Sequence, residues 1–282
     1  SFIDTMATVV DAFNFFNDFG SPELLVDREL TDIEEDDRSI VNLLTDQIEF
    51  ADVVIINKSD LVDKNTLDLL EAMITKLNSR AKIIKTSHSK VPLKSVINTG
   101  LFDYDEAEQS AGWIEELNKP EHTPETEEYG IGSFAFRSKK PFNSERFWNY
   151  IQNDFPHNVI RSKGLFWIDS RPNQAMTWGQ AGGSLKADSA GVWWSSMPMK
   201  ERSNYADFMS NQKVIKKDWD KQFGDRKNEL VFIGQDLNKE KIVMELNKCL
   251  SSDNEIVNLE WESGIEDSWP VQRAIPPHKQ DY

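Results

Sequence analysis

The chain has 282 residues and 39% hydrophobic content, which is enough for two folded units of ordinary size. Its formal net charge of −16 argues against sequence-independent binding to nucleic acid, because such binding needs a basic surface. The single cysteine excludes an intramolecular disulfide, and neither a membrane-spanning apolar stretch nor a signal-peptide core is present, so we expect a cytoplasmic protein.

The first 102 residues predict strands that alternate with helices. Such alternation is typical of a mostly parallel sheet with crossover helices. Between the first two helices, the acidic run at 30–38 is interpreted as a solvated surface. The pattern comprises strands at 6–12, 52–56 and 81–85 and helices at 12–19, 39–48 and 65–78, with Ser39 as a helix cap.

The second predicted strand ends in Asn57, Lys58, Ser59 and Asp60. A carboxylate such as Asp60 can accept from both N1–H and the exocyclic amine of guanine, a paired contact that adenine cannot make. The methylene stem of Lys58 can cover the base plane, and the Asn57 amide can bond the purine edge and brace neighbouring backbone. These residue types are also favoured in turns, so a polar turn after a buried strand is the alternative.

The third predicted strand leads into Thr86, Ser87, His88 and Ser89. In a parallel sheet this loop lies at the same edge as the segment that begins at Asn57, where open α/β sheets bind their ligands. Its backbone N–H groups can then reach the guanine carbonyl oxygen. A serine-rich turn without a ligand is the other interpretation.

An acidic, proline-containing stretch at 103–128 predicts a linker, and a second unit at 129–282 follows it. Several strands with helices gathered on one face predict an α+β layer. Its aromatic residues include Trp193 and Trp194, whose rings would lie on opposite faces of a strand, so that an exposed one marks an interface. The second unit has predicted strands at 134–137, 159–169, 174–180, 191–195 and 229–234 and helices at 143–155, 205–223 and 238–250.

Other candidate sites have simpler interpretations. The glycine-rich segment 179–184 lacks a phosphate-binding lysine and is interpreted as a hairpin turn. Arg161 and Lys163 could contact nucleotide phosphate, a missing amino-terminal half or a client protein, or could lie on an ordinary half-exposed strand. Cys249 is interpreted as a small buried hydrophobe. His122, among the glutamates of the linker, is interpreted as solvated rather than metal-binding.

The order of these motifs resembles the CobW-like GTPases, a family of metallochaperones, and in particular its zinc-associated branch. The resemblance runs from residue 8 to residue 270. It is carried by 8–12, 47–52 and 57–60 in the first half and by 127–131, 161–164, 180–184 and 229–234 in the second.

The resemblance implies a partial P-loop-GTPase-type parallel sheet at 1–102 and a CobW C-terminal α+β domain at 129–282. It also implies a protein that binds and hydrolyses GTP, with Mg²⁺ in the intact protein, and that delivers a metal, with zinc expected, to a metal-dependent client protein. The residues expected to bind GTP or GDP are Asn57, Lys58, Asp60, Thr86, Ser87 and His88.

The sequence also departs from the family pattern. It contains no Gly-x-x-x-x-Gly-Lys-Ser/Thr phosphate loop and no Cys-x-Cys-Cys metal motif. We therefore expect an amino-terminally truncated chain that is not catalytic alone, with no catalytic or metal-ligating residue of its own. A non-catalytic protein-interaction module is the alternative. Exposed strand edges would also permit a homo-oligomer.

Overall fold

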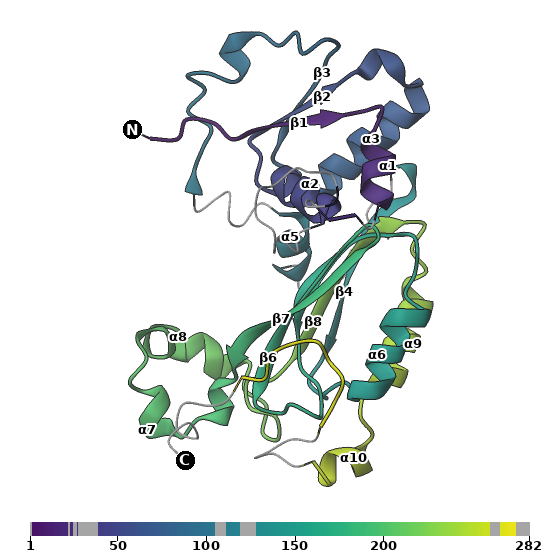
Figure 1. Ribbon diagram of the computed structural model, residues 1–282. Coiled ribbons are helices and arrows are strands. Elements are labelled where there is room, and N and C mark those ends of the chain that lie inside the picture. Colours follow the sequence, from purple (N-terminus) through teal and green to yellow (C-terminus); the bar gives the residue numbers. More distant parts are fainter. Residues whose placement is uncertain are drawn as a thin grey trace.

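The computed structural model describes residues 2–21, 23–24, 27, 39–104, 111–118, 128–259 and 266–274. Its first half is a three-stranded parallel sheet in the order β1-β2-β3, and its second half is a five-stranded antiparallel sheet in the order β4-β8-β5-β6-β7 (Figure 1). The predicted mixed architecture, a parallel layer followed by an α+β layer, is therefore confirmed.

The parallel sheet forms because strands and helices alternate along the chain. Ser39 caps α2 by accepting from the Asn42 N–H at 3.3 Å, as predicted, and Asp63 caps α3 by accepting from the Thr66 N–H at 2.9 Å. The elements are β1 (Ala7–Asp11), α1 (Phe15–Gly20), α2 (Ile40–Glu49), β2 (Val53–Asn57), α3 (Lys64–Leu77) and β3 (Lys82–Lys85), with short 3-10 turns at Ser59–Leu61 and Leu93–Ser95.

The predicted strand at 6–12, whose apolar residues are typical of a buried strand, lies at an edge of the sheet among the described residues. Strand β1 pairs with β2 alone, and within it only Val10 is fully buried, whereas Val9 is 57% exposed. The interior strand is β2, whose first four residues are all buried. The apolar sequence of β1 therefore predicted the strand correctly but its burial incorrectly. Burial of a strand depends on which elements pack on either side of it, and the strand's own residues do not specify those elements.

In the second half, helices α6 and α9 cover one face of the antiparallel sheet (Figure 1). Aromatic side chains such as Trp178 dominate the core between them, whereas Trp167 is buried in a separate smaller cluster with Phe223. The elements are α5 (Gly112–Asn118), β4 (Ile131–Ser138), α6 (Ser144–Asn153), β5 (Val159–Phe166), β6 (Gln174–Ala181), β7 (Ser184–Val192), α7 (Met199–Arg202), α8 (Ala206–Lys217), β8 (Asn228–Gln235), α9 (Lys239–Cys249) and α10 (Asp253–Val257), with 3-10 turns at Glu128–Gly130 and Trp194–Ser196.

Two predictions for the second half were wrong in detail. Strand β7 begins at Ser184 rather than 191, because the two-residue turn at Gly182 reverses the chain at once. Its exposed polar residues carry no apolar alternation that would have revealed the strand. Trp193 is buried, and Trp194 starts a 3-10 turn with its ring 5.2 Å from that of Phe208, so neither marks an exposed interface.

Part of the predicted linker is folded. Helix α5 packs against β4 and β8, and its Glu116 is buried and accepts from the Ser133 hydroxyl at 2.8 Å. The acidic run at 30–38 and His122 lie outside the described residues. None of the helices in the described ranges is long and apolar enough to cross a membrane.

One hydrophobic core extends through both halves. It joins residues of α2 and α3, such as Ile48 and Ile74, to the ends of the antiparallel strands, such as Ile160, Ala181 and Ile233. The two halves therefore share buried surface, and a movement of one sheet against the other would disturb this core.

Candidate functional site

Two loops meet at the carboxyl ends of β2 and β3. The Asn57 side chain donates to the Ser89 hydroxyl at 3.0 Å and accepts from the Ser89 backbone N–H at 2.9 Å. Both the backbone N–H and the hydroxyl of Ser59 donate to the Thr86 carbonyl, at 3.1 and 2.9 Å. The two segments that the sequence singled out thus form one hydrogen-bonded structure, as expected for adjacent parallel strands.

Lys58 is held in a fixed position beside these loops. Its backbone has φ 58°, in the left-handed region, and its Nζ donates to Asp11 Oδ2 at 2.6 Å. Asp11 ends β1 directly opposite Asn57, and its other oxygen accepts from the Phe13 N–H at 3.0 Å. Burial alone would raise the pKa of Asp11, but the hydrogen bonds from Lys58 and Asn14 outweigh it and hold the pKa below its ordinary value.

Asp11 is the residue of this site that sequence reasoning missed. The sequence pattern places it only within the predicted strand at 6–12, and its contact with Lys58 spans 47 positions of the chain. The available signal was its place as a carboxylate at the carboxyl end of β1, the strand neighbour of β2.

Asp60 lies in the 3-10 turn that follows Lys58, and its side chain is exposed. Among the described residues it forms no hydrogen bond or ion pair. Its carboxylate is therefore available to a ligand, while Asn57 and Lys58 beside it are fixed by the protein.

The second loop divides into a buried and an exposed part. The hydroxyl of Thr86, which is 9% exposed, donates to the Lys90 carbonyl at 2.9 Å, so this side chain closes the loop rather than facing outward. Ser87 is half-buried and His88 is exposed. His88 and Ser89 both have φ 53°, which turns the backbone sharply beside Asn57.

Arg161 does not lie on a half-exposed strand, and its described partners are in the first half of the chain. It is 3% exposed, and its guanidinium makes paired hydrogen bonds to Glu49, itself 1% exposed, at 2.8 and 3.0 Å. Nη2 also contacts Asp46 at 3.0 Å. Lys163 lies 3.8 Å from Glu49 and over the Trp113 ring. This buried ion pair joins α2 to β5 across the two halves.

The glycine-rich segment is a hairpin turn, as predicted. Gly182 joins β6 to β7 with φ +48°, and a Cβ at this position would lie 1.9 Å from the Phe19 carbonyl oxygen. Only glycine permits this approach between the hairpin and α1.

Cys249 is buried, as predicted, and burial raises the pKa of its thiol to about 11. The described part of the chain contains no group of three or more His, Cys, Asp and Glu side chains that could hold a metal ion.

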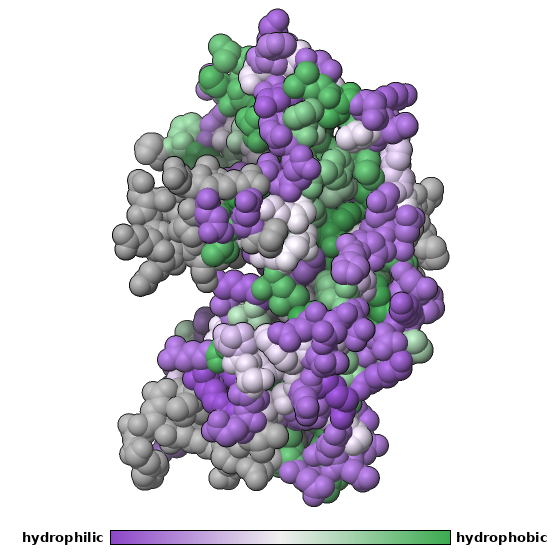
Figure 2. All heavy atoms as spheres, turned by 45° about the vertical axis from the view of Figure 1, so that its right-hand side comes forward, coloured by the Kyte–Doolittle hydropathy of each residue, from purple (hydrophilic) through white to green (hydrophobic). Residues whose placement is uncertain are grey.

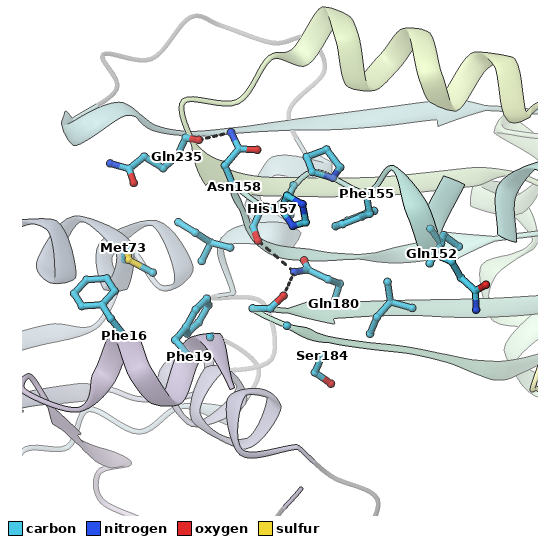
Figure 3. Close-up of a pocket in the computed structure, with 18 of the residues that line it drawn as sticks. Phe16, Phe19, Met73, Gln152, Phe155, His157, Asn158, Gln180, Ser184 and Gln235 are labelled. Carbon is cyan, nitrogen blue, oxygen red and sulfur yellow. Dashed lines mark hydrogen bonds between the residues drawn. The ribbon is translucent and has the colours of Figure 1, made fainter. Parts of the chain in front are cut away.

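A groove of about 590 Å³ lies where the two halves meet (Figure 3). Phe16 and Phe19 of α1 and Met73 of α3 form one side. Gln180 of β6 and the segment that contains His157 form the other. The groove is separate from the loops that begin at residues 57 and 86, none of whose residues line it.

Both halves of the chain match known protein families. Residues 1–85 match the family model described as CobW/HypB/UreG, nucleotide-binding domain, and residues 131–250 match the one described as Cobalamin synthesis protein cobW C-terminal domain. The Zinc-regulated GTPase metalloprotein activator 1 of Dictyostelium discoideum is 41% identical over 258 residues, which are 90% of this chain and 53% of that protein.

Two relatives of lower identity also match most of this chain and about half of their own length. A zinc chaperone of Mycobacterium tuberculosis is 25% identical over 87% of this chain and 57% of its own length, and the zinc chaperone YjiA of Escherichia coli is 23% identical over 70% and 51%. The solved structure of Zn(II)-bound YjiA GTPase from E. coli is 18% identical, covers 89% of this chain and 62% of its own, and has a TM-score of 0.37.

The chain spans about half the length of the curated relatives it matches. Both matched models nevertheless fall on the units seen in the structure, one on the parallel sheet and one on the antiparallel sheet. The chain therefore belongs to the CobW family.

Proposed function

We propose that this chain supplies the guanine-reading part and the C-terminal domain of a GTP-binding metallochaperone that delivers zinc to a client protein. Guanine binding is supported by the exposed carboxylate of Asp60. This carboxylate lies beside Asn57 and Lys58, whose side chains are held in place by hydrogen bonds within the protein. The zinc part is supported by relatives named as a zinc-regulated GTPase metalloprotein activator and as zinc chaperones.

In this proposal each residue has a distinct task. Asp60 accepts from N1–H and the exocyclic amine of guanine, and the stem of Lys58 covers the base. Asn57 holds the second loop through Ser89, so that the backbone near Ser87 and His88 faces the guanine carbonyl oxygen. Thr86 supports the loop from inside.

Base preference tests this assignment. We expect the chain to bind GDP more tightly than ADP in an NMR titration. Asp60→Ala should lower the ratio of the ADP and GDP dissociation constants by about tenfold, because a bidentate contact to the base is lost. In Asp60→Asn the new amide N–H matches the C2 carbonyl of xanthine, so we expect the preference to move from GDP to xanthosine diphosphate.

Asp253→Asn is the matched control, because it removes one negative charge from an exposed site on α10. It should leave the GDP preference unchanged. Equal affinity for GDP and ADP in the unaltered chain, or an unchanged preference in both Asp60 variants, would refute the assignment.

A non-catalytic interaction module is the second candidate function. It is favoured by the absence of a Gly-x-x-x-x-Gly-Lys-Ser/Thr segment from the sequence, since phosphoryl transfer needs that cradle and its Mg²⁺. We expect this chain to show no GTP turnover above a buffer blank. Turnover that disappears in Asp60→Ala would remove the second candidate and reveal an unconventional phosphate site.

A further inference from the structure

Helix α8 buries less of its surface than the other long helices of the antiparallel half. Helices α6 and α9 each bury three residues, and their outward faces are mostly hydrophilic (Figure 2). Helix α8 lies apart from them (Figure 1), and among the residues that the structure describes it buries Phe208 alone. A helix of this length usually depends on a packed apolar face for its stability, so α8 presents surface that a partner can cover.

The segment around α8 is basic, although the chain as a whole is strongly acidic. Residues 199–227 contain eight Lys and Arg against five Asp and Glu, which is a formal net charge of +3. Because the whole chain carries −16, the remaining residues together carry −19. The segment therefore attracts negatively charged groups, whereas the rest of the chain, taken together, repels them.

One face of α8 combines positive charge with apolar surface. Lys213, Lys216 and Lys217 are exposed, and within the described ranges none of their ammonium groups forms an ion pair or a hydrogen bond. Met209 is 53% exposed and lies one helical turn before Lys213, and Val214 is 66% exposed and lies one turn before Lys217. We call these five residues the basic face of α8.

A groove of about 510 Å³ lies at the end of this face. Lys217 and Trp219 line one side of it, and the end of β4 and the start of β8 line the other. In the groove Lys227 is paired with Glu229 at 2.7 Å, whereas Lys217 has no such pair in the described part of the chain. The Trp219 ring is 36% exposed and adds apolar surface next to Lys217.

An acidic segment of a partner protein fits this surface. Its carboxylates can pair with the three lysines, and apolar side chains between them can cover Met209 and Val214. Nucleic acids and anionic membranes are extended polyanions, so they also meet the field of the acidic remainder of the chain. A short segment feels mainly the charges within about 10 Å, roughly one Debye length at 0.1 M salt. We propose that the basic face of α8 binds an acidic, apolar segment of a partner protein.

The proposal does not depend on guanine binding, because no residue of the basic face belongs to the loops that begin at residues 57 and 86. A fluorescein-labelled peptide of Glu and Leu tests it by fluorescence anisotropy with the unaltered chain. Peptides of Lys and Leu and of Glu and Ser are the matched probes, since each removes either the negative charge or the apolar groups. We expect the Glu and Leu peptide to bind at least about tenfold more tightly than either.

Variants of the basic face identify the site. We expect Lys213→Glu and Lys217→Glu together to weaken binding of the Glu and Leu peptide by about tenfold, because repulsion replaces attraction. Val214→Ser should weaken it several-fold by removing apolar surface. Lys248→Glu is the control, because it changes a lysine in the last turn of α9 just as Lys217→Glu does in the last turn of α8, and it should leave binding intact. Circular dichroism checks that each variant folds.

Salt separates the two contributions. Added salt should weaken binding of the Glu and Leu peptide, because it screens exposed charges, while the loss caused by Val214→Ser should persist. Equal binding of the three peptides, or unchanged binding in the variant that combines Lys213→Glu with Lys217→Glu, would overturn the proposal. Tighter binding of single-stranded DNA or of phosphatidylserine vesicles than of the acidic peptide would overturn it as well.

Discussion

The buried ion pair between Arg161 and Glu49 should be a principal determinant of how the two halves hold together. The pair is 3% and 1% exposed, and its two hydrogen bonds of 2.8 and 3.0 Å link β5 to the last residue of α2. Glu49→Leu would leave the guanidinium buried, with Asp46 as its remaining carboxylate partner among the described residues, and the Asp46 side chain is itself 55% exposed.

Removing one partner of a buried pair costs about 3–5 kcal/mol, because the other charge remains desolvated. At roughly 2–4 °C per kcal/mol for a chain of this size, we expect Glu49→Leu to lower Tm by on the order of 10 °C. Arg161→Met should cost less, since Lys163 lies 3.8 Å from Glu49 and retains part of the charge balance.

The double variant Glu49→Leu with Arg161→Met tests whether the loss of stability comes from a buried charge that has lost its partner. Because it replaces the pair with apolar groups and leaves no buried charge unpaired, we expect it to be more stable than Glu49→Leu alone. The assay is urea unfolding followed by tryptophan fluorescence, with calorimetry for Tm. Additive losses, or a loss below about 1 kcal/mol for Glu49→Leu, would refute the reasoning.

Two further predictions concern the contacts around α1. Asp11→Asn removes the charge that holds Lys58 Nζ at 2.6 Å. Since we propose that Lys58 covers the guanine base, and because the pair is partly exposed, we expect GDP binding in calorimetry to weaken by only about threefold. Unchanged affinity would mean that Asp11 does not position the loop. Gly182→Ala would place a Cβ 1.9 Å from the Phe19 carbonyl oxygen, and we expect a loss of about 2 kcal/mol or more in urea unfolding. Gly100→Ala is its control, since it has a similar left-handed φ of +61° but open space around it, and equal losses in both would show that contact with α1 is unimportant.

The sequence by itself determined the features that depend on neighbours along the chain. The apolar run of β2, the polar turn after it and the cap of α3 are encoded within a few residues of one another, so strand, loop and helix followed from local pattern. The hairpin at Gly182 was predictable for the same reason.

Only the tertiary structure decided the contacts between distant segments. Asp11 meets Lys58 and Glu49 meets Arg161 because parallel pairing and a shared core bring them together, and no local pattern shows which distant residue each of them contacts. The groove between the two halves likewise draws its described lining from α1, α3 and the second sheet. Local propensity acts over a few residues, whereas these contacts span from 47 to 112 positions and depend on which surfaces are buried together.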